Sequence, residues 1–589
     1  MENKKTKIDK QAIQEAYQTL QKYKKGKATL EQRIVDEEKF WKGRHWEAVQ
    51  RKDGDTQKPT SAWLFNSIIN KHADAMDSFP EAVCLPREES DEESAKTLTK
   101  VLPVVLKHND FEKVYSDNWW YKLKHGFCVY GVFWDGNASD GKGDVAVKKI
   151  DALNIFWEPG ITDIQKSRNL FILDLVSVDS LNERYPKMQF KGGESDDLKQ
   201  YVFDDDVDTT DKALVVDWYY KKDGKLHYCK FCEENILFSS ENEKGYENGW
   251  YEDNRYPVVF DVLYPEEGTV FGFGIISIAK DPQLFIDKLD ESFMNHAMIA
   301  SKPRYFAKQS AGVNEQEFLD LTKPIVHVEG DIDDNRLKPI QVYNVPGYMM
   351  NFRQAKIDEL KETSSNRDFS QGSTAGGVTS GAAIAVLQEA GNKTSRDMIK
   401  ASYRSFEAII DMTIERFRQF YTDTHTFRIV GTNGENQFTE FNNSGLVPQS
   451  IGVVPAPTDI GGTVELFRKP IFDIDVVAQK MNPFSTLAQN ETAMNLYTSG
   501  LLAPENAQVA MIVLDMMTFE GKEKVISYVS EGATLQNQLA QMKQDNARLE
   551  AEIARLQGGM PNGMPQGVGT PHPSAMLTPS PQGEGLMAM

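Results

Sequence analysis

The chain has little cysteine and no long apolar segment. Only four of its 589 residues are cysteines, which is too few for the disulfide framework of a small secreted protein, so we expect reduced thiols. No apolar run approaches the ~20 residues that span a bilayer. The Lys- and Glu-rich start of the sequence also lacks the apolar core of a signal peptide. These absences predict a protein that folds in the cytosol and has no membrane partner.

Basic residues are scarce relative to acidic ones. Lys and Arg number 66 against 87 Asp and Glu, which gives a net charge of −21. A protein that grips DNA by its phosphates is normally basic, at least locally. Either DNA is not the ligand, or the protein surrounds DNA without holding it. The content of 40% hydrophobic and 26% charged residues is otherwise that of a globular protein with several domains.

Helical segments and strand-like segments succeed one another along the chain. The spacing of apolar residues predicts helices over about 9–52, 62–77 and 93–125. Short β-rich runs separated by Gly, Asp and Asn turns fill residues 127–265, and similar runs return at 425–477. This mixture indicates an α+β fold.

The middle of the chain has the most distinctive order of elements. Asp281 and Pro282 predict a helix start, because Asp can cap the first amides and Pro fits the first helical position. β-like pieces and polar loops follow, then a second helix at about 348–362. A Gly/Ser/Thr-rich stretch that cannot form a core comes next, and we expect it to be a mobile loop. A long helix then runs from about 382 to 421.

Apolar residues near the C-terminus recur at alternating spacings of four and three, the pattern of a coiled coil. Asn546 lies within this seam, where a single asparagine typically fixes register and suits a dimer. A dimer, a larger helical barrel and a contact with a different protein all remain open. Residues 558–589 are rich in Pro, Gly, Met and Ser, which predicts disorder. The seam consists of Leu535, Leu539, Met542, Asn546, Leu549, Ile553 and Leu556.

Three motifs partly match known ligand-binding motifs but lack residues that those motifs require. Residues 136–142 (GNASDGK) match most of a phosphate-binding P-loop, but Gly143 stands where Ser or Thr must bind Mg²⁺, so we interpret them as a hairpin turn. Cys229 and Cys232 form a CxxC motif without the second pair of a zinc site. The acidic run at 204–208 lacks the Gly and Glu of a calcium loop. We therefore predict no enzyme activity, no cofactor and no metal.

Several short motifs, taken in order, resemble those of bacteriophage portal proteins. Residues 40–46 (FWKGRHW) resemble the family's early aromatic-Gly-Trp element, and residues 59–66 (PTSAWLFN) resemble the helix that follows it. Residues 256–283 resemble the lead into the first stem helix, and residues 377–381 (GVTSG) resemble the end of the tunnel loop. The resemblance covers roughly 35–480 and draws its specificity from the order and spacing of the motifs.

The resemblance implies a multidomain α+β portal fold with a helical stem, a β-containing clip and an α-helical crown. Copies of the chain, twelve by resemblance, would close into a ring around a central channel. The implied parts are a wing at 1–270 and 382–478, stem helices at 271–300 and 348–363, a clip at 301–347, a tunnel loop at 364–381, a crown at 479–530, a coiled coil at 531–557 and a disordered tail at 558–589.

The same resemblance implies a function in the virion, at the portal vertex of the capsid. The ring would conduct double-stranded DNA, without sequence preference, during packaging and genome ejection. The implied partners are other copies of the chain, the terminase large subunit, head–tail adaptor proteins, and the major capsid and scaffolding proteins, met in the host cytoplasm during assembly. Two alternatives remain: a DNA-packaging NTPase or nuclease, and a cytosolic coiled-coil scaffold.

An acidic surface suits such a channel. A basic wall would hold DNA at many phosphates, whereas an acidic wall repels them and lets the DNA slide. On the tunnel loop, Arg367, Phe369 and Gln371 are predicted to touch the DNA backbone without reading bases. The charged candidates for the channel wall and the clip are Asp287, Asp290, Glu291, Lys302, Arg304, Lys308, Asp358 and Glu362.

Overall fold

The computed structural model forms two compact units, residues 1–481 and 482–589, which are treated separately below. The residues that the structure describes are 8–48, 58–192, 211–301, 305–307, 312–320, 322, 324–329, 337–340, 344–364, 393–430, 436–455, 463–480, 511 and 522–557.

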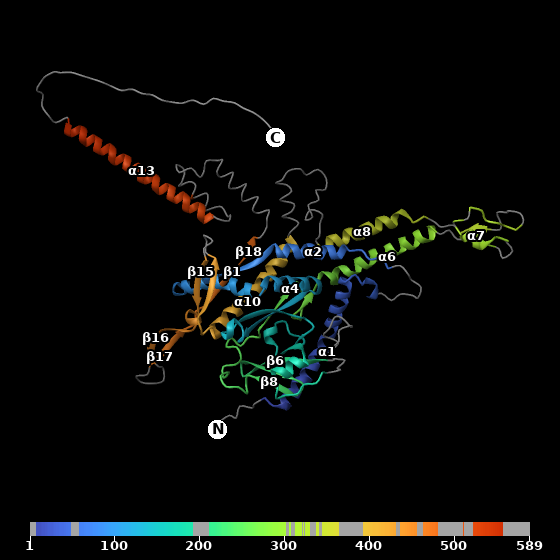
Figure 1. Cartoon of the computed structure of the whole chain (residues 1–589), viewed down its shortest axis with the longest axis horizontal. Helices are drawn as coiled ribbons and strands as arrows, with labels where there is room; N and C mark the ends of the chain where they lie inside the picture. Colours follow the sequence, from blue (N-terminus) through green and yellow to red (C-terminus); the bar gives the residue numbers. More distant parts are fainter. Residues whose placement is uncertain are drawn as a thin grey trace, which may run out of the picture. The chain divides into compact units, whose positions relative to one another are not determined.

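The first unit mixes helices with antiparallel strands (Figure 1), which confirms the predicted α+β class. The described part of the second unit contains the helix α13 (Lys522–Gln557). The helices described in the first unit are α1 (Lys10–Trp41), α2 (Trp63–Met76), α3 (Glu92–His108), α4 (Phe111–His125), α5 (Val178–Arg184), α6 (Ile275–Ser301), α7 (Glu315–Leu319), α8 (Gly347–Thr363) and α10 (Lys393–Phe420).

Two larger sheets have the strand orders β4-β5-β6-β7-β8 and β3-β2-β9, and five further sheets of the described residues are two-stranded pairs. The larger sheets use β2 (Phe127–Asp135), β3 (Asp144–Ile150), β4 (Ile155–Trp157), β5 (Asn169–Ser177), β6 (Lys212–Lys222), β7 (Lys225–Cys232), β8 (Asn235–Ser239) and β9 (Val258–Val262). The pairs are β1 (Ser78–Pro86) with β18 (Phe472–Lys480), β10 (Tyr264–Pro265) with β11 (Gly272–Phe273), β12 (Tyr305–Ala307) with β13 (Leu337–Pro339), β14 (His425–Val430) with β15 (Asn436–Phe441), and β16 (Gln449–Pro455) with β17 (Thr463–Arg468).

Helix α1 joins two hydrophobic cores. Its first half packs Ile13 and Leu20 on one face of the five-stranded sheet, and its second half buries Ile34 in the main core. Between the two, the ammonium group of Lys27 is buried and donates to the carbonyl oxygen of Ile155 at 2.8 Å. Such burial lowers the pKa of Lys27 to about 8. The helix is therefore fixed to the five-stranded sheet by its first half and to the main core by its second half.

The main core lies around α4, α10 and the three-stranded sheet. Helix α10 has a buried apolar face, with Phe406, Ile410 and Phe417 in this core. At its centre the Nζ of Lys122 on α4 lies 2.8 Å from a carboxylate oxygen of Asp261 on β9, and both side chains are almost fully buried. Removal of one partner from such a buried pair strongly destabilises the fold, because the other charge is left buried without compensation. The two elements are thus held in one arrangement.

Three predicted helix boundaries are wrong. The helix expected over about 9–52 ends at Trp41, and a separate short 3₁₀ helix follows at His45–Ala48. The single helix expected over 93–125 is two helices, because Asp110 adopts a left-handed conformation (φ 48°) that interrupts the helical path. The helix expected to start at Asp281 begins six residues earlier, at Ile275, and Pro282 lies inside it. Buried Ile275 and Ile276 hold this first turn against the main core, so tertiary packing outweighs the proline signal.

Candidate functional site

Helices α6 and α8 leave the body of the first unit together and lie side by side (Figure 1). Near the body, Ile286 of α6 packs with Ile357 and Leu360 of α8 in a small buried cluster. Farther out, the guanidinium group of Arg353 on α8 contacts both carboxylate oxygens of Asp290 on α6, with its Nη2 at 3.0 Å. A two-point contact between a guanidinium group and a carboxylate is attractive and also restricts the relative orientation of the two side chains. The two helices therefore form one projecting pair.

The base of the pair is anchored through a buried carboxylate. Asp287 of α6 is fully buried and accepts hydrogen bonds from the Ser61 N–H (3.0 Å), the Ser61 hydroxyl (2.9 Å) and the Gln283 amide (3.0 Å). Its other oxygen lies 2.6 Å from Nδ1 of His45. Gln283 in turn accepts from the N–H of Leu64 at 3.1 Å. This network ties α6 to the segment between α1 and α2.

A second polar junction joins α6 to α1 and α4. Nδ1 of His125 lies 3.0 Å from Glu37, which also accepts from the hydroxyl of Ser277 on α6. Burial opposes ionisation of Glu38, but hydrogen bonds from His125 and Lys124 outweigh it and lower the pKa of Glu38 to about 2. The α6 base is therefore held at two separate places by charged side chains.

The outer side of α8 is acidic. Asp358 and Glu362 lie four positions apart, about one helical turn, and both are exposed. Asp358 accepts a hydrogen bond from the Gln354 amide at 2.9 Å. Glu362 follows the buried Leu360 by two positions, slightly over half a helical turn, so Glu362 points away from the buried cluster around Ile357.

The pair ends in a small β element. Strand β12, which follows α6, pairs with β13, which precedes α8, and an isolated bridge joins Val313 to Val328 nearby. Several large apolar side chains here are exposed, among them Phe306, Leu319 and Ile325. The arrangement is therefore two helices that enclose a β-containing tip.

A family model described as phage P22-like portal protein matches residues 20–564 of the chain. The chain belongs to this family. The match spans nearly the whole sequence and confirms the portal protein resemblance. Its members are structural ring proteins of the phage capsid that act in DNA packaging and head–tail connection. A comparison with curated proteins finds no match.

The structure of this portal subunit corrects one predicted channel residue. Asp287 was expected on the channel wall, but its carboxylate is buried inside the subunit and fully engaged by its neighbours. Asp290 is bound to Arg353 between the helices, and Glu291 is half-buried. Asp358 and Glu362 are exposed. Outside the described residues lie Lys302, Arg304, Lys308, Arg367, Phe369 and Gln371.

The partners that hold Asp287 at the base of the α6–α8 pair escaped the sequence prediction. His45 was noted only as part of an aromatic motif, and Ser61 only as part of a helix-start motif. A usable signal was present in the spacing of Gln283 and Asp287, which are four positions apart on one face of an amphipathic helix. Polar residues at such a spacing on an apolar face indicate a buried hydrogen-bond network.

The ligand-like motifs of the portal subunit have structural explanations. Residues 136–142 form the turn between the paired strands β2 and β3, which confirms the hairpin interpretation. Cys229 and Cys232 of β7 face opposite sides of their sheet, in two different cores, and burial raises their pKa to about 12 and about 11. Among the described residues no group of metal-binding side chains gathers, and no helix is long and apolar enough to cross a membrane. The acidic run at 204–208 lies outside these residues.

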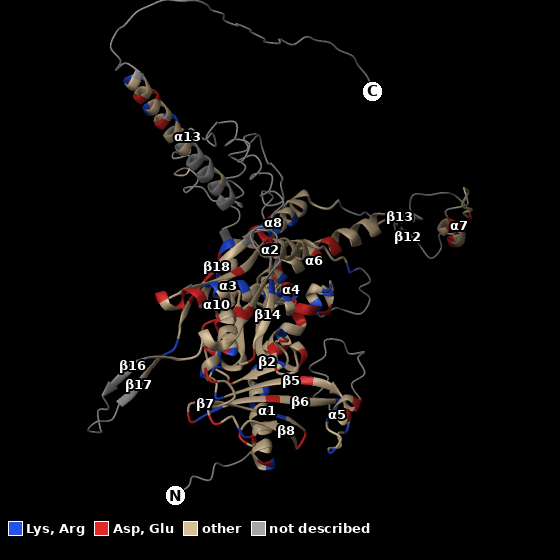
Figure 2. Cartoon of the chain, turned by 60° about the vertical axis from the view of Figure 1, so that its left-hand side comes forward, with Lys and Arg blue, Asp and Glu red and all other residues tan. Residues whose placement is uncertain are grey.

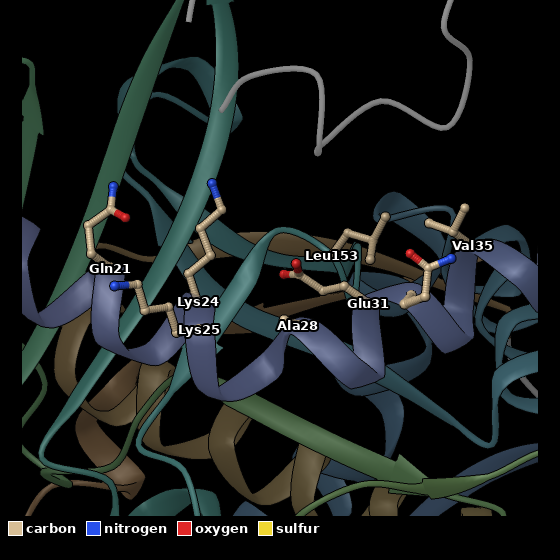
Figure 3. A pocket seen from close by; sticks show the side chains of 8 residues that line it. Gln21, Lys24, Lys25, Ala28, Glu31, Val35 and Leu153 are labelled. Carbon is tan, nitrogen blue, oxygen red and sulfur yellow. The ribbon is translucent and has the colours of Figure 1, made fainter. Parts of the chain in front are cut away.

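A shallow pocket of about 400 Å³ lies along α1. Figure 3 shows Lys24, Glu31 and Leu153 on its lining, with the side chains of Lys24 and Glu31 on the same side of the helix. Burial raises the pKa of Glu31, and Lys27 opposes this rise from 3.7 Å away. The lining contains no histidine, cysteine or hydroxyl side chain.

In the second unit, α13 carries the predicted seam. Leu539, Met542, Leu549, Ile553 and Leu556 are all exposed on this helix, although they are apolar. Basic and acidic residues are interspersed along its other positions (Figure 2). A helix with one exposed apolar stripe and mixed charges elsewhere has the surface of a coiled-coil strand.

Proposed function

We propose that twelve copies of this subunit form a ring whose central channel conducts double-stranded DNA into and out of the capsid. Helices α6 and α8 correspond to the stem segments expected at 271–300 and 348–363, and the β12–β13 tip is the clip, within 301–347. The wing comprises 1–270 and 382–478, the tunnel loop 364–381 and the crown 479–530.

The observation that carries this proposal is the α6–α8 pair itself. It is anchored to the body at Asp287, is locked by the Arg353–Asp290 contact, and carries a β element at its far end. A rigid pair with an acidic outer side is what a channel wall needs, because its copies around a ring would surround DNA with negative charge. Asp358 and Glu362 repel the phosphates, so the DNA slides without being held.

The tunnel loop would narrow the channel. Its Gly-rich sequence allows backbone conformations that other residues rarely adopt. We propose that Arg367, Phe369 and Gln371 touch the DNA backbone there and read no bases. Lys302, Arg304 and Lys308 would add a basic ring at the clip.

The exposed tip supports docking of other proteins. Phe306, Leu319 and Ile325 offer apolar contact area of the kind found at protein interfaces. We propose that this surface binds the terminase large subunit during packaging, and head–tail adaptor proteins afterwards. Capsid and scaffolding proteins would be met on the wing, in the host cytoplasm, during assembly. ATP hydrolysis would belong to the motor, and the portal subunit would need no cofactor.

The exposed seam of α13 needs a helical partner. We propose that α13 forms a coiled coil with the same helix of another copy, with Asn546 setting the register.

Charge reversal on the proposed channel wall tests this function. Rings with Asp358→Lys and Glu362→Lys should assemble, but DNA packaged per capsid should fall severalfold at low salt and recover as salt weakens the new phosphate contacts. The matched control is Asp179→Lys, a charge reversal at an exposed acid on α5. Unchanged packaging by the double variant at low salt would contradict the channel assignment, and absence of rings in electron micrographs of the wild type would contradict the function.

A further inference from the structure

Helices α6 and α8 carry large apolar side chains that no described part of the subunit covers. Phe285 of α6 and Phe352 of α8 are 52% and 50% exposed. The Nζ of Lys356 lies 6.0 Å from the Phe285 ring centroid and 5.6 Å from that of Phe352, so both rings belong to one surface. We call this surface the phenylalanine flank of the pair.

The opposite side of the pair has a different apolar surface. Met294 and Met298 of α6 are 42% and 43% exposed, and Met350 of α8 is 57% exposed. Met294 lies nine positions after Phe285, about two and a half helical turns, and therefore on the other side of α6. Met350 precedes Phe352 by two positions, slightly over half a turn, and lies on the other side of α8. These three methionines define the methionine flank.

We propose that the phenylalanine flank of each subunit packs against the methionine flank of the next copy around the ring. A ring that closes by rotation needs two different, complementary surfaces on each subunit. The pair presents two such surfaces on opposite sides. Methionine side chains are flexible and make favourable sulfur–aromatic contacts, so the two surfaces match in chemistry.

The inference rests on the proposed ring and names the contact that closes it. Apolar patches shared by two helices on the surface of a soluble protein mark an interaction site. The occupant is a second copy, because the family forms rings and because the complement of each flank is present on the same chain. Glu362 follows the buried Leu360 by two positions and points away from it. Packing of the flanks therefore leaves the acidic side of α8 free to face the channel.

Two variants of the full chain, each altered on one flank, test the pairing. One carries Phe285→Lys and Phe352→Lys, and the other carries Met294→Glu and Met298→Glu. Each should remain monomeric at concentrations where the wild type forms rings, as measured by native mass spectrometry and negative-stain electron microscopy. Phe438→Lys, at an exposed phenylalanine of β15, is the matched control and should form rings.

Mixing the two variants in equal amounts gives the decisive result. In an alternating ring, every lysine flank meets a glutamate flank and every native phenylalanine flank meets a native methionine flank. Rings should therefore reappear in the mixture. If either variant fails the thermal-unfolding check for folding, the milder pair Phe352→Lys and Met350→Glu replaces it in the same design.

Two results would overturn the pairing: rings formed by either variant alone as readily as by the wild type, or folded variants that do not form rings when mixed. Both leave the wild-type ring intact, and with it the proposed function. Absence of rings in the wild type itself would instead refute the proposed function.

Discussion

Replacement of Asp287 by alanine should detach the base of the α6–α8 pair. The buried carboxylate accepts three hydrogen bonds from Ser61 and Gln283 and lies 2.6 Å from Nδ1 of His45. A hydrogen bond to a charged group is typically worth about 1.5–3 kcal/mol, but these bonds share one carboxylate and do not add independently. Removal of one member of a buried charged network typically costs about 3–5 kcal/mol. We expect the free energy of local opening to fall by about this amount.

Hydrogen exchange followed by mass spectrometry measures this opening directly. Peptides that cover residues 59–66 and 283–290 should exchange at least roughly a hundredfold faster in Asp287→Ala, since each 1.4 kcal/mol corresponds to about a factor of ten. Asp358→Ala removes an exposed carboxylate from α8 and should leave these peptides unchanged. Equal exchange in Asp287→Ala and in the wild type would refute the view that this carboxylate anchors the pair.

Three further changes have defined outcomes. The pKa of Glu38 is lowered to about 2, so its ion pairs stabilise the fold above about pH 4.5 and this contribution is lost as the pH falls toward 2. Glu38→Gln should therefore lower the free energy of unfolding at neutral pH by up to about 3 kcal/mol and remove that acid dependence. Thermal unfolding between pH 2 and 7 measures both effects. The argument fails if wild type and variant keep the same pH profile. Arg353→Lys retains the charge but loses the two-point contact with Asp290, which should reduce the free energy of local opening by about 1 kcal/mol. Peptides from α8 should then exchange their amide hydrogens roughly fivefold faster. An unchanged exchange rate would show that the two-point contact does not stabilise the pair. Leu549→Asp should make residues 535–556 of the ring much more susceptible to limited proteolysis, whereas Leu549→Ile should not; equal cleavage of both would count against a coiled coil.

Elements with strong local signals were predictable from the sequence. The helix expected at about 348–362 is α8, Gly347–Thr363, because Pro346 defines its start and no internal residue opposes it. The start of α6 was missed because the signal at Asp281 and Pro282 is local, whereas burial of Ile275 and Ile276 depends on elements distant in the sequence. Local propensity is a weak prior that tertiary packing overrides in such cases.

The candidate site was less predictable than the fold for a related reason. Asp287, Asp290, Asp358 and Glu362 look alike in a sequence, since all are acids on polar helices. Their roles differ because of partners that the sequence does not identify: Asp287 meets Ser61, 226 positions away. Exposure, and with it the capacity to face DNA, depends on these long-range contacts, and the spacing of Gln283 and Asp287 indicates burial without identifying the partner.

The pairing of β1 with β18 has a consequence for synthesis of the chain. Ser78 lies opposite Lys480 and Pro86 opposite Phe472, so the strand made early finds its only described neighbour in one made nearly 400 residues later. At about 5–20 residues per second, a ribosome needs roughly 20–80 s to bridge this interval. Until then β1 lacks this partner strand, and a polypeptide that ends before Phe472 never acquires it.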